Sequence, residues 1–250
     1  MVSAIKIVFL LGFLILIHES GHYFVAKLCK IKVNEFAIGF GPKIFSKKKN
    51  DTVYELRLIP LGGFVSLEGE EELSDKEGSF SKASIPKRIA IVAAGALVNI
   101  IFGLIVYFII MAYKYLIVMN SSFMNAIMFG LESSGRLIIE AILSIFQLFT
   151  GKLSLNDFTG PVGISNIVSQ TNGVLEFIYL LSIISISLGI TNLLPFVPLD
   201  GGKIVIYLIE AIRKKSLKRE TEEKIQLLGI ILLISLSVVV TFNDILKLIK

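Results

Sequence analysis

The chain has 250 residues, of which 54% are hydrophobic and only 18% are charged, and its mean hydropathy is +0.79. These values lie far from the averages of soluble domains and indicate an integral membrane protein. The net charge of +5 does not point to nucleic acid, because the basic residues fall in loops that flank apolar runs, where membrane topology explains them.

The first apolar run, residues 4–28, exceeds the roughly 20 residues that a transmembrane helix needs. It lacks the basic start and the short apolar core of a cleaved signal peptide, so we expect it to remain as a membrane span. Cys29 follows it and is the single cysteine, which excludes an internal disulfide.

Within this run, His18-Glu19-Ser20-Gly21-His22 reads H-E-x-x-H and contains the only two histidines of the chain. Residues four apart on a helix share one face, so both imidazoles can reach one zinc ion, with Glu19 beside them as a base. So short a motif also occurs by chance, but ionisable side chains inside a membrane-length segment are costly and indicate function. Catalytic zinc sites take three protein ligands, so a third ligand is expected elsewhere.

Residues 31–72 change to short β-like segments, at residues 32–40 and 52–58, with a hairpin tip at residues 47–51. Two interpretations are open. The region is an ordinary solvated loop, or it is a re-entrant hairpin that enters the membrane where protein or water covers its backbone. The apolar content of residues 59–67 favours the re-entrant hairpin.

Three further spans are expected, at residues 89–113, 174–199 and 225–242. An interfacial helix is expected at residues 136–150, whose apolar stretch is too short to cross a membrane. We find no internal repeat. The sequence therefore predicts one all-α polytopic membrane domain over residues 1–250, with about four transmembrane helices and a membrane-associated, re-entrant β-hairpin region after the first.

Two of these spans contain unusual residues. Gly95, Asn99 and Gly103 recur every four positions in the second span, which favours close packing against the first span. The third span breaks at two prolines just before Asp200.

The lysines and arginines concentrate in two loops, residues 27–88 and 203–224. The positive-inside rule places both loops in the cytoplasm and both termini outside. His18 and His22 then lie toward the cytoplasmic end of the first span and Asp200 at the same end of the third. A carboxylate there could instead cap a helix or pair with a loop lysine, but only a metal site also explains the histidines, so Asp200 is the expected third ligand.

Taken together, the motifs resemble the site-2 protease family of intramembrane zinc metalloproteases, and most its RseP/RasP-type bacterial branch. The matching pieces are His18-Glu19-Ser20-Gly21-His22, Gly39-Phe40-Gly41-Pro42, Pro60-Leu61-Gly62-Gly63-Phe64-Val65, Ala94-Gly95 with Asn99, Gly160-Pro161-Val162-Gly163-Ile164, and the run from Asn192 to Gly202. They follow the family's order over nearly the whole chain.

The resemblance implies that His18, His22 and Asp200 bind Zn²⁺, that Glu19 is the catalytic acid and base, and that Asn192 helps to hold the substrate or its oxyanion. Two features depart from the family pattern. Ala96 stands where relatives often have proline, and residues 114–172 are too short for a PDZ domain in addition to the interfacial helix.

We therefore expect a bacterial, multi-pass cell-membrane protease, with its active site toward the cytoplasm, that cleaves peptide bonds within or near transmembrane segments. The expected partners are the lipid bilayer and transmembrane protein or peptide substrates, such as an anti-sigma factor or a signal-peptide remnant. An exposed strand edge at residues 52–67, which includes Leu56, Arg57 and Leu58, could hold the unwound peptide by strand addition. The alternatives are a metal or proton transporter, although transporters commonly show repeated halves, and a silent binding protein, against which Glu19 argues.

Overall fold

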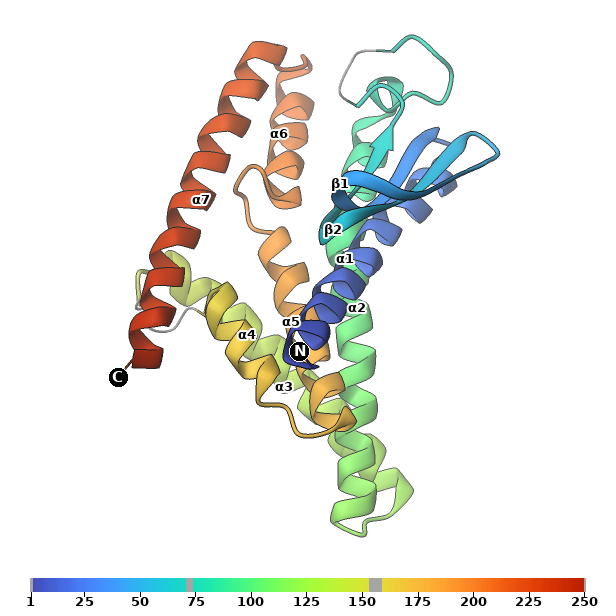
Figure 1. Ribbon diagram of the computed structural model, residues 1–250. Helices are drawn as coiled ribbons and strands as arrows, with labels where there is room; N and C mark the ends of the chain where they lie inside the picture. Colours follow the sequence, from blue (N-terminus) through green and yellow to red (C-terminus); the bar gives the residue numbers. More distant parts are fainter. Residues whose placement is uncertain (1, 71–73, 153–158, 250) are drawn as a thin grey trace. The chain divides into compact units, whose positions relative to one another are not determined.

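The computed structural model describes residues 2–70, 74–152 and 159–249, and it is mainly helical with one β hairpin (Figure 1). The elements in chain order are α1 (Val2–Leu28), β1 (Val33–Lys49), β2 (Thr52–Leu67), the 3₁₀ helix η1 (Phe80–Lys82), α2 (Ile85–Val118), α3 (Phe123–Phe149), α4 (Pro161–Ser169), α5 (Val174–Asn192), α6 (Asp200–Arg213) and α7 (Arg219–Ile249). Among the described residues, four helices are long and apolar enough to cross a membrane: α1, α2, α5 and α7.

The number of long apolar helices agrees with the four expected spans, although their bounds differ from the expected ones. The third expected span, residues 174–199, ends at Asn192, and Asp200 begins a separate helix, α6, that was not predicted. Pro195 and Pro198 explain the difference, because proline cannot donate the hydrogen bond that would continue the helix.

By contrast, the interfacial helix expected at residues 136–150 is longer than predicted, since α3 begins at Phe123. Its added turns pack on the end of α2, where the rings of Tyr115 and Phe129 stack at 4.4 Å. Ser122 also caps the start of α3, because its Oγ accepts the backbone N–H of Asn125 at 3.3 Å.

The chain divides into two compact units. Unit 1 comprises Met1–Lys6, Ile100–Ile190 and Ile231–Lys250, and unit 2 comprises Ile7–Asn99 and Thr191–Ile230. The single domain over the whole chain stays a prediction. All the residues of the candidate site described below belong to unit 2.

The second span was expected to pack on the first through Gly95, Asn99 and Gly103. In the structure, Gly103 belongs to unit 1 and packs elsewhere. A β-carbon at Gly103 would lie 2.6 Å from the carbonyl oxygen of Ser182, so this part of α2 packs closely on α5. Elsewhere in unit 1, the buried Asp244 of α7 accepts a hydrogen bond from the backbone N–H of Gly163 at 2.8 Å and so caps the start of α4.

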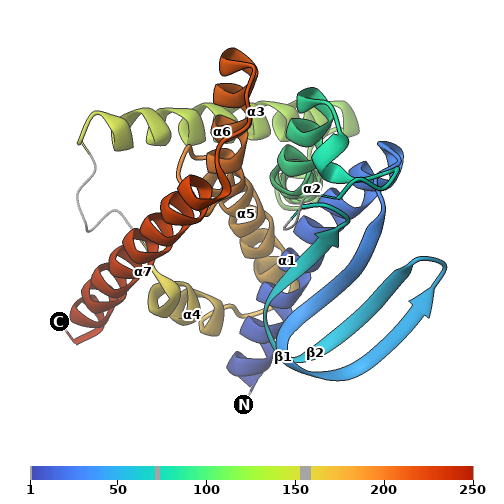
Figure 2. The ribbon, with the colours of Figure 1, turned by 90° about the horizontal axis from the view of Figure 1, so that it is seen from above.

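The hairpin of unit 2 confirms the predicted strands and extends both of them (Figure 2). Its tip is the turn at Asn50 and Asp51, where Asn50 has a φ of 53°. Residues 35–38 of β1 pair with residues 63–66 of β2 on one side and with residues 53–56 on the other. The outer edge of residues 63–66 has no further strand beside it in the described part of the chain.

A hydrophobic core joins this hairpin to the helices of unit 2. Its buried members come from α1, β1, β2, η1, α2, α6 and the loop before β1, and they are Ala26, Ile31, Val33, Leu67, Phe80, Ile91, Val92, Ile206 and Tyr207. Arg88 crosses the same region, lying over the ring of Tyr207 and 3.6 Å from the carboxylate of Glu210. The core therefore holds α1, α2 and α6 in fixed positions around the residues that the sequence singled out.

Candidate metal centre

The two histidines of the H-E-x-x-H motif and Asp200 converge in unit 2. His18 and His22 lie one turn apart on α1, and Asp200 is the first residue of α6. The Nε2 atoms of the histidines are 3.2 Å apart, and Oδ2 of Asp200 lies 3.2 Å from His18 Nε2 and 3.5 Å from His22 Nε2. Among the described residues this is the only group of three metal-ligating side chains.

These distances fit a zinc ion. Zinc bonds of about 2 Å in a tetrahedron space the ligand atoms about 3.3 Å apart. Oδ2 of Asp200 is buried and has no hydrogen-bond partner in the part of the chain that the structure describes. A buried carboxylate oxygen normally requires a partner, and a cation shared with the two imidazoles would supply it.

One face of α2 supports both imidazole rings. Ile91, Gly95 and Asn99 recur every four residues on this face. The Nδ1 atom of His22 donates to the carbonyl oxygen of Ile91 at 2.8 Å, which leaves Nε2 with a free lone pair for a metal. The lack of a side chain at Gly95 is required here, because a β-carbon would lie 2.4 Å from Nε2 of His22.

Glu19 lines a cavity of about 300 Å³ together with His18, His22 and Asp200. The same cavity is lined by the later half of β2, at Gly63, Phe64, Val65 and Leu67, and by Ile91, Val92, Pro198, Glu70 and Lys203. A β-carbon at Gly63 would lie 3.0 Å from Cγ of Glu19, so this strand passes close to the carboxylate. The cavity is thus lined by an acid–base group, by the three candidate ligands and by the later half of β2.

Other residues singled out by the sequence lie elsewhere. Asn192 is the last residue of α5, half-buried, and is not among the residues that line the cavity. Leu56 and Arg57 are paired within the hairpin, Leu56 with Ile38 and with Phe45, and Leu58 is largely exposed. The structure therefore does not bring Asn192 or Leu56–Leu58 to the cavity wall.

The family of the chain follows from comparison with known proteins. The model of peptidase family M50 matches residues 6–236, which includes every residue of the metal centre. The chain belongs to peptidase family M50. It is thus an intramembrane zinc metalloprotease with Zn²⁺ as its cofactor, as the resemblance implied, and the transporter alternative has no support.

Bacterial relatives align with this M50 peptidase over nearly their whole lengths. A Fusobacterium nucleatum protein, provisionally named a zinc metalloprotease, is 27% identical and aligns over 96% of this chain and 98% of its own. The zinc metalloproteases RasP of Geobacillus kaustophilus and Bacillus licheniformis are 25% and 23% identical, and each alignment covers 98% of this chain. These relatives and the four apolar helices indicate a multi-pass membrane protein.

The relatives also contain segments that this M50 peptidase lacks. The alignment with the Geobacillus protein runs over 414 positions, although this chain has 250 residues, and it covers 98% of both chains. Long insertions in the relative account for the difference. Between α2 and α5 the described residues form α3, α4 and the turns beside them.

Sequence reasoning missed three features of the site. The carbonyl of Ile91 gives no signal in a sequence, because every residue has one. The ion pair between Lys203 and Glu70, at 3.0 Å, joins residues 133 positions apart. The contact of Asn99 with His18 was not predicted, because Gly95, Asn99 and Gly103 were interpreted only as residues that let two helices pack closely.

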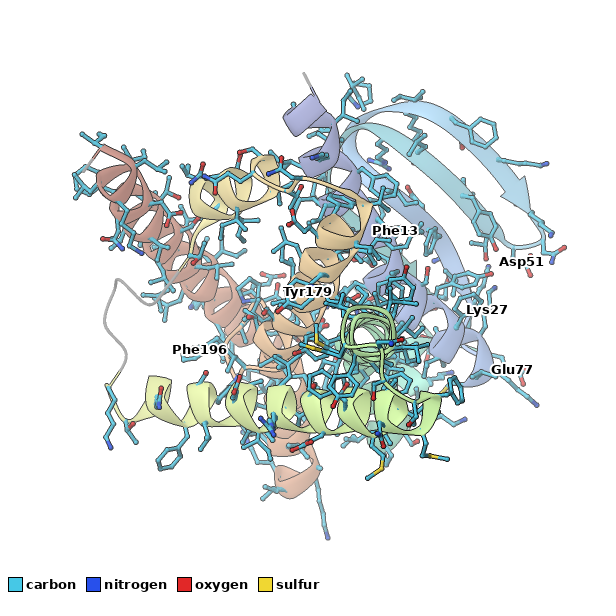
Figure 3. The ribbon with its side chains drawn as sticks, turned by 90° about the horizontal axis from the view of Figure 1, so that it is seen from below. Phe13, Lys27, Asp51, Glu77, Tyr179 and Phe196 are labelled. Atoms are coloured by element: carbon cyan, nitrogen blue, oxygen red, sulfur yellow. The ribbon has the colours of Figure 1, made fainter. Side chains whose placement is uncertain are left out.

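A second, more open cavity of about 460 Å³ lies at the end of α1 and contains no group of metal ligands among its lining residues. Its walls include Lys27, Asp51 and Glu77, which gather on one side of the hairpin (Figure 3). Unlike the metal centre, this second cavity contains no histidine among its lining residues.

Proposed function

We propose that His18, His22 and Asp200 hold the zinc ion of this protease and that Glu19 is its general acid and base. The observation that supports this assignment is the convergence of three ligand atoms, all within 4.8 Å of one another, on a cavity that Glu19 also lines. Zinc bound there supplies Lewis acidity to a water molecule and to the peptide carbonyl.

Glu19 does the proton chemistry in this proposal. Its carboxylate takes a proton from the attacking water and later delivers it to the leaving amine. The carboxylate shares its cavity with Asp200 and with Lys203, and Lys203 is held by Glu70 at 3.0 Å. Asn192, eight residues before Asp200, is proposed to bind the substrate or its developing oxyanion through its amide.

The substrate must unwind before it is cut, because a transmembrane helix engages its carbonyls in hydrogen bonds to residues four positions on. We place the unwound peptide along the outer edge of residues 63–66, which lines the cavity beside Glu19. Leu56, Arg57 and Leu58 then contribute by shaping the hairpin, since Leu56 already has strand partners on both sides.

The membrane placement completes the proposal. The hairpin re-enters the membrane, the basic loops at residues 27–88 and 203–224 are cytoplasmic, and both termini are outside. The metal centre then lies toward the cytoplasmic side of a bacterial cell membrane. M50 peptidases of this kind act on membrane proteins, and an anti-sigma factor or a signal-peptide remnant is a suitable substrate.

Metal analysis of the purified protein tests the ligand set. We expect about one zinc per chain in the wild type, and loss of zinc in a His18→Ala, His22→Ala double variant and in Asp200→Ala. Ser182→Ala, which changes a buried residue of unit 1, is the matched control. Stoichiometric zinc in the double variant would overturn the assignment.

A further inference from the structure

The residue of α2 that faces His18 has no role in the chemistry so far described. Asn99 is fully buried, with 0% of its surface exposed, and its side-chain Nδ2 lies 3.4 Å from Nδ1 of His18. It lies on α2 eight residues, or about two turns, beyond Ile91, whose carbonyl oxygen binds His22. The two imidazoles thus each meet one polar group of the same helix face.

Burying an amide in the apolar interior of a helix pair costs free energy unless the amide is hydrogen-bonded. Leucine or alanine would pack there without that cost. The buried amide therefore needs polar partners, and Nδ1 of His18 lies within reach of it.

The chemistry of His18 sets the direction of this hydrogen bond. A metal on Nε2 leaves the hydrogen on Nδ1, which must then donate it. An amide nitrogen cannot accept it, but a half-turn of the amide group exchanges Nδ2 for Oδ1 with almost no change in shape. The metal-bound state therefore requires Asn99 to present Oδ1 to His18.

We infer that Asn99 is a positioning residue of the metal centre, whose side-chain oxygen accepts the Nδ1–H of His18 and holds the ring in the tautomer and orientation that bind zinc. The inference rests on the proposed ligation by His18, His22 and Asp200. The two imidazoles are then oriented by different kinds of group. His22 is oriented by a backbone carbonyl that no substitution removes, and His18 is oriented by a side chain that can be replaced.

Two substitutions separate this role from helix packing. Asn99→Leu keeps the approximate size and removes the acceptor, and Asn99→Asp keeps an acceptor oxygen in the same place. Zinc affinity is measured on the full-length protein in detergent by competition with a chelator, and the visible spectrum of the Co²⁺-substituted protein reports the ligand geometry. We expect Asn99→Leu to weaken zinc binding by about 10- to 100-fold and to alter the Co²⁺ spectrum.

Asn99→Asp should retain the wild-type affinity and spectrum, and so should the control Ser182→Ala, which removes a buried hydroxyl from unit 1. If Asn99→Leu does not fold, Asn99→Ala takes its place, because it also removes the acceptor and is smaller than the native side chain.

The inference is overturned if the variant without an acceptor binds zinc as tightly as the wild type, or if Asn99→Asp loses affinity to the same extent. The ligand assignment itself fails in a different way, namely if the wild type binds no zinc or if His18→Ala binds zinc normally. Loss of zinc in His18→Ala together with normal binding in Asn99→Leu would reject the role of Asn99 alone.

Discussion

Gly95 lies directly against His22, so that a β-carbon at position 95 would be 2.4 Å from Nε2 of the imidazole and 2.9 Å from Cε1 of His18. Both atoms belong to the rings that converge on the proposed metal position. Neither ring can move away easily, because His22 is bound to the carbonyl oxygen of Ile91 and α1 is packed on α2, where a β-carbon at Gly21 would lie 2.5 Å from the carbonyl oxygen of Ala94. The absence of a side chain at Gly95 is therefore a condition for the site.

Replacing Gly95 with alanine should thus displace the imidazoles and weaken zinc binding by at least about tenfold. The measurement is the zinc content of the purified variant after dialysis against a weak chelator. Gly135→Ala is the control, because a β-carbon there meets nothing within 4 Å, and its zinc content should match the wild type. Full zinc occupancy in Gly95→Ala would mean that the rings have room to move.

Glu19→Gln should retain zinc and lose proteolysis, because glutamine keeps the shape of the side chain and removes the base. General acid–base catalysis contributes about 10²- to 10⁴-fold to rate, so cleavage should fall by at least that factor. Cleavage of a membrane substrate and zinc content are measured on the same preparation. Wild-type cleavage in this variant would reject Glu19 as the base.

The ion pair between Lys203 and Glu70 links α6 to the loop after β2, and both residues line the cavity. Removing one partner leaves a largely buried charge without compensation, and we expect Lys203→Met or Glu70→Gln to lower the free energy of unfolding by about 1–3 kcal/mol. Because the double variant leaves no unpaired charge, it should recover part of this loss. Thermal unfolding of the four proteins checks the prediction, and strictly additive losses would contradict it.

Glu55 supports the hairpin from its interior, where its side chain is fully buried beside Lys43 and Arg57. Burial alone would raise the pKa of the Glu55 carboxyl, but its hydrogen bonds with Lys43, Glu35 and Arg57 outweigh this effect and lower the pKa from 4.5 to about 2. A lowered pKa means that the folded hairpin is stabilised above the unfolded-state pKa and that this stabilisation is lost as the pH falls from about 4.5 toward 2.

Glu55→Gln should therefore speed hydrogen exchange in residues 43–57 at neutral pH, and the difference from the wild type should shrink as the pH falls below 4.5. Hydrogen exchange read by mass spectrometry, corrected for the intrinsic pH dependence of exchange, measures both effects. Glu132→Gln, which affects only an exposed pair with Arg136, is the control. A difference that is independent of pH would show that the Glu55 charge is not involved.

Substrates that unwind easily should be cut faster. Glycine is about 1 kcal/mol and proline about 3 kcal/mol less favourable than alanine in a helix, so replacing one glycine near the cut by leucine should slow cleavage about fivefold, and replacing a proline should slow it more. The same replacements outside the membrane segment serve as controls. Equal cleavage of all these substrates would mean that unwinding does not limit the reaction.

The sequence by itself indicated four long apolar helices and a pair of histidines on one of them. Long apolar runs can be recognised without a fold because the bilayer thickness sets their length, and His18 and His22 could be paired because four residues on a helix bring side chains to one face. Topology then placed Asp200 at a matching depth, and that expectation agrees with the structure, which puts its Oδ2 3.2 Å from His18 Nε2.

Only the tertiary structure decided which groups surround these ligands. The contacts of Ile91 with His22 and of Asn99 with His18 join residues 69 and 81 positions apart, and a local pattern contains no information about such pairs. The pairing of residues 35–38 with two segments of β2 likewise depends on how the hairpin folds back on itself, which gives Leu56 strand partners on both sides and leaves the outer edge of residues 63–66 without a further strand in the described part of the chain. Local periodicity reports which face of an element is apolar, whereas the partner of that face is set by packing of the whole unit.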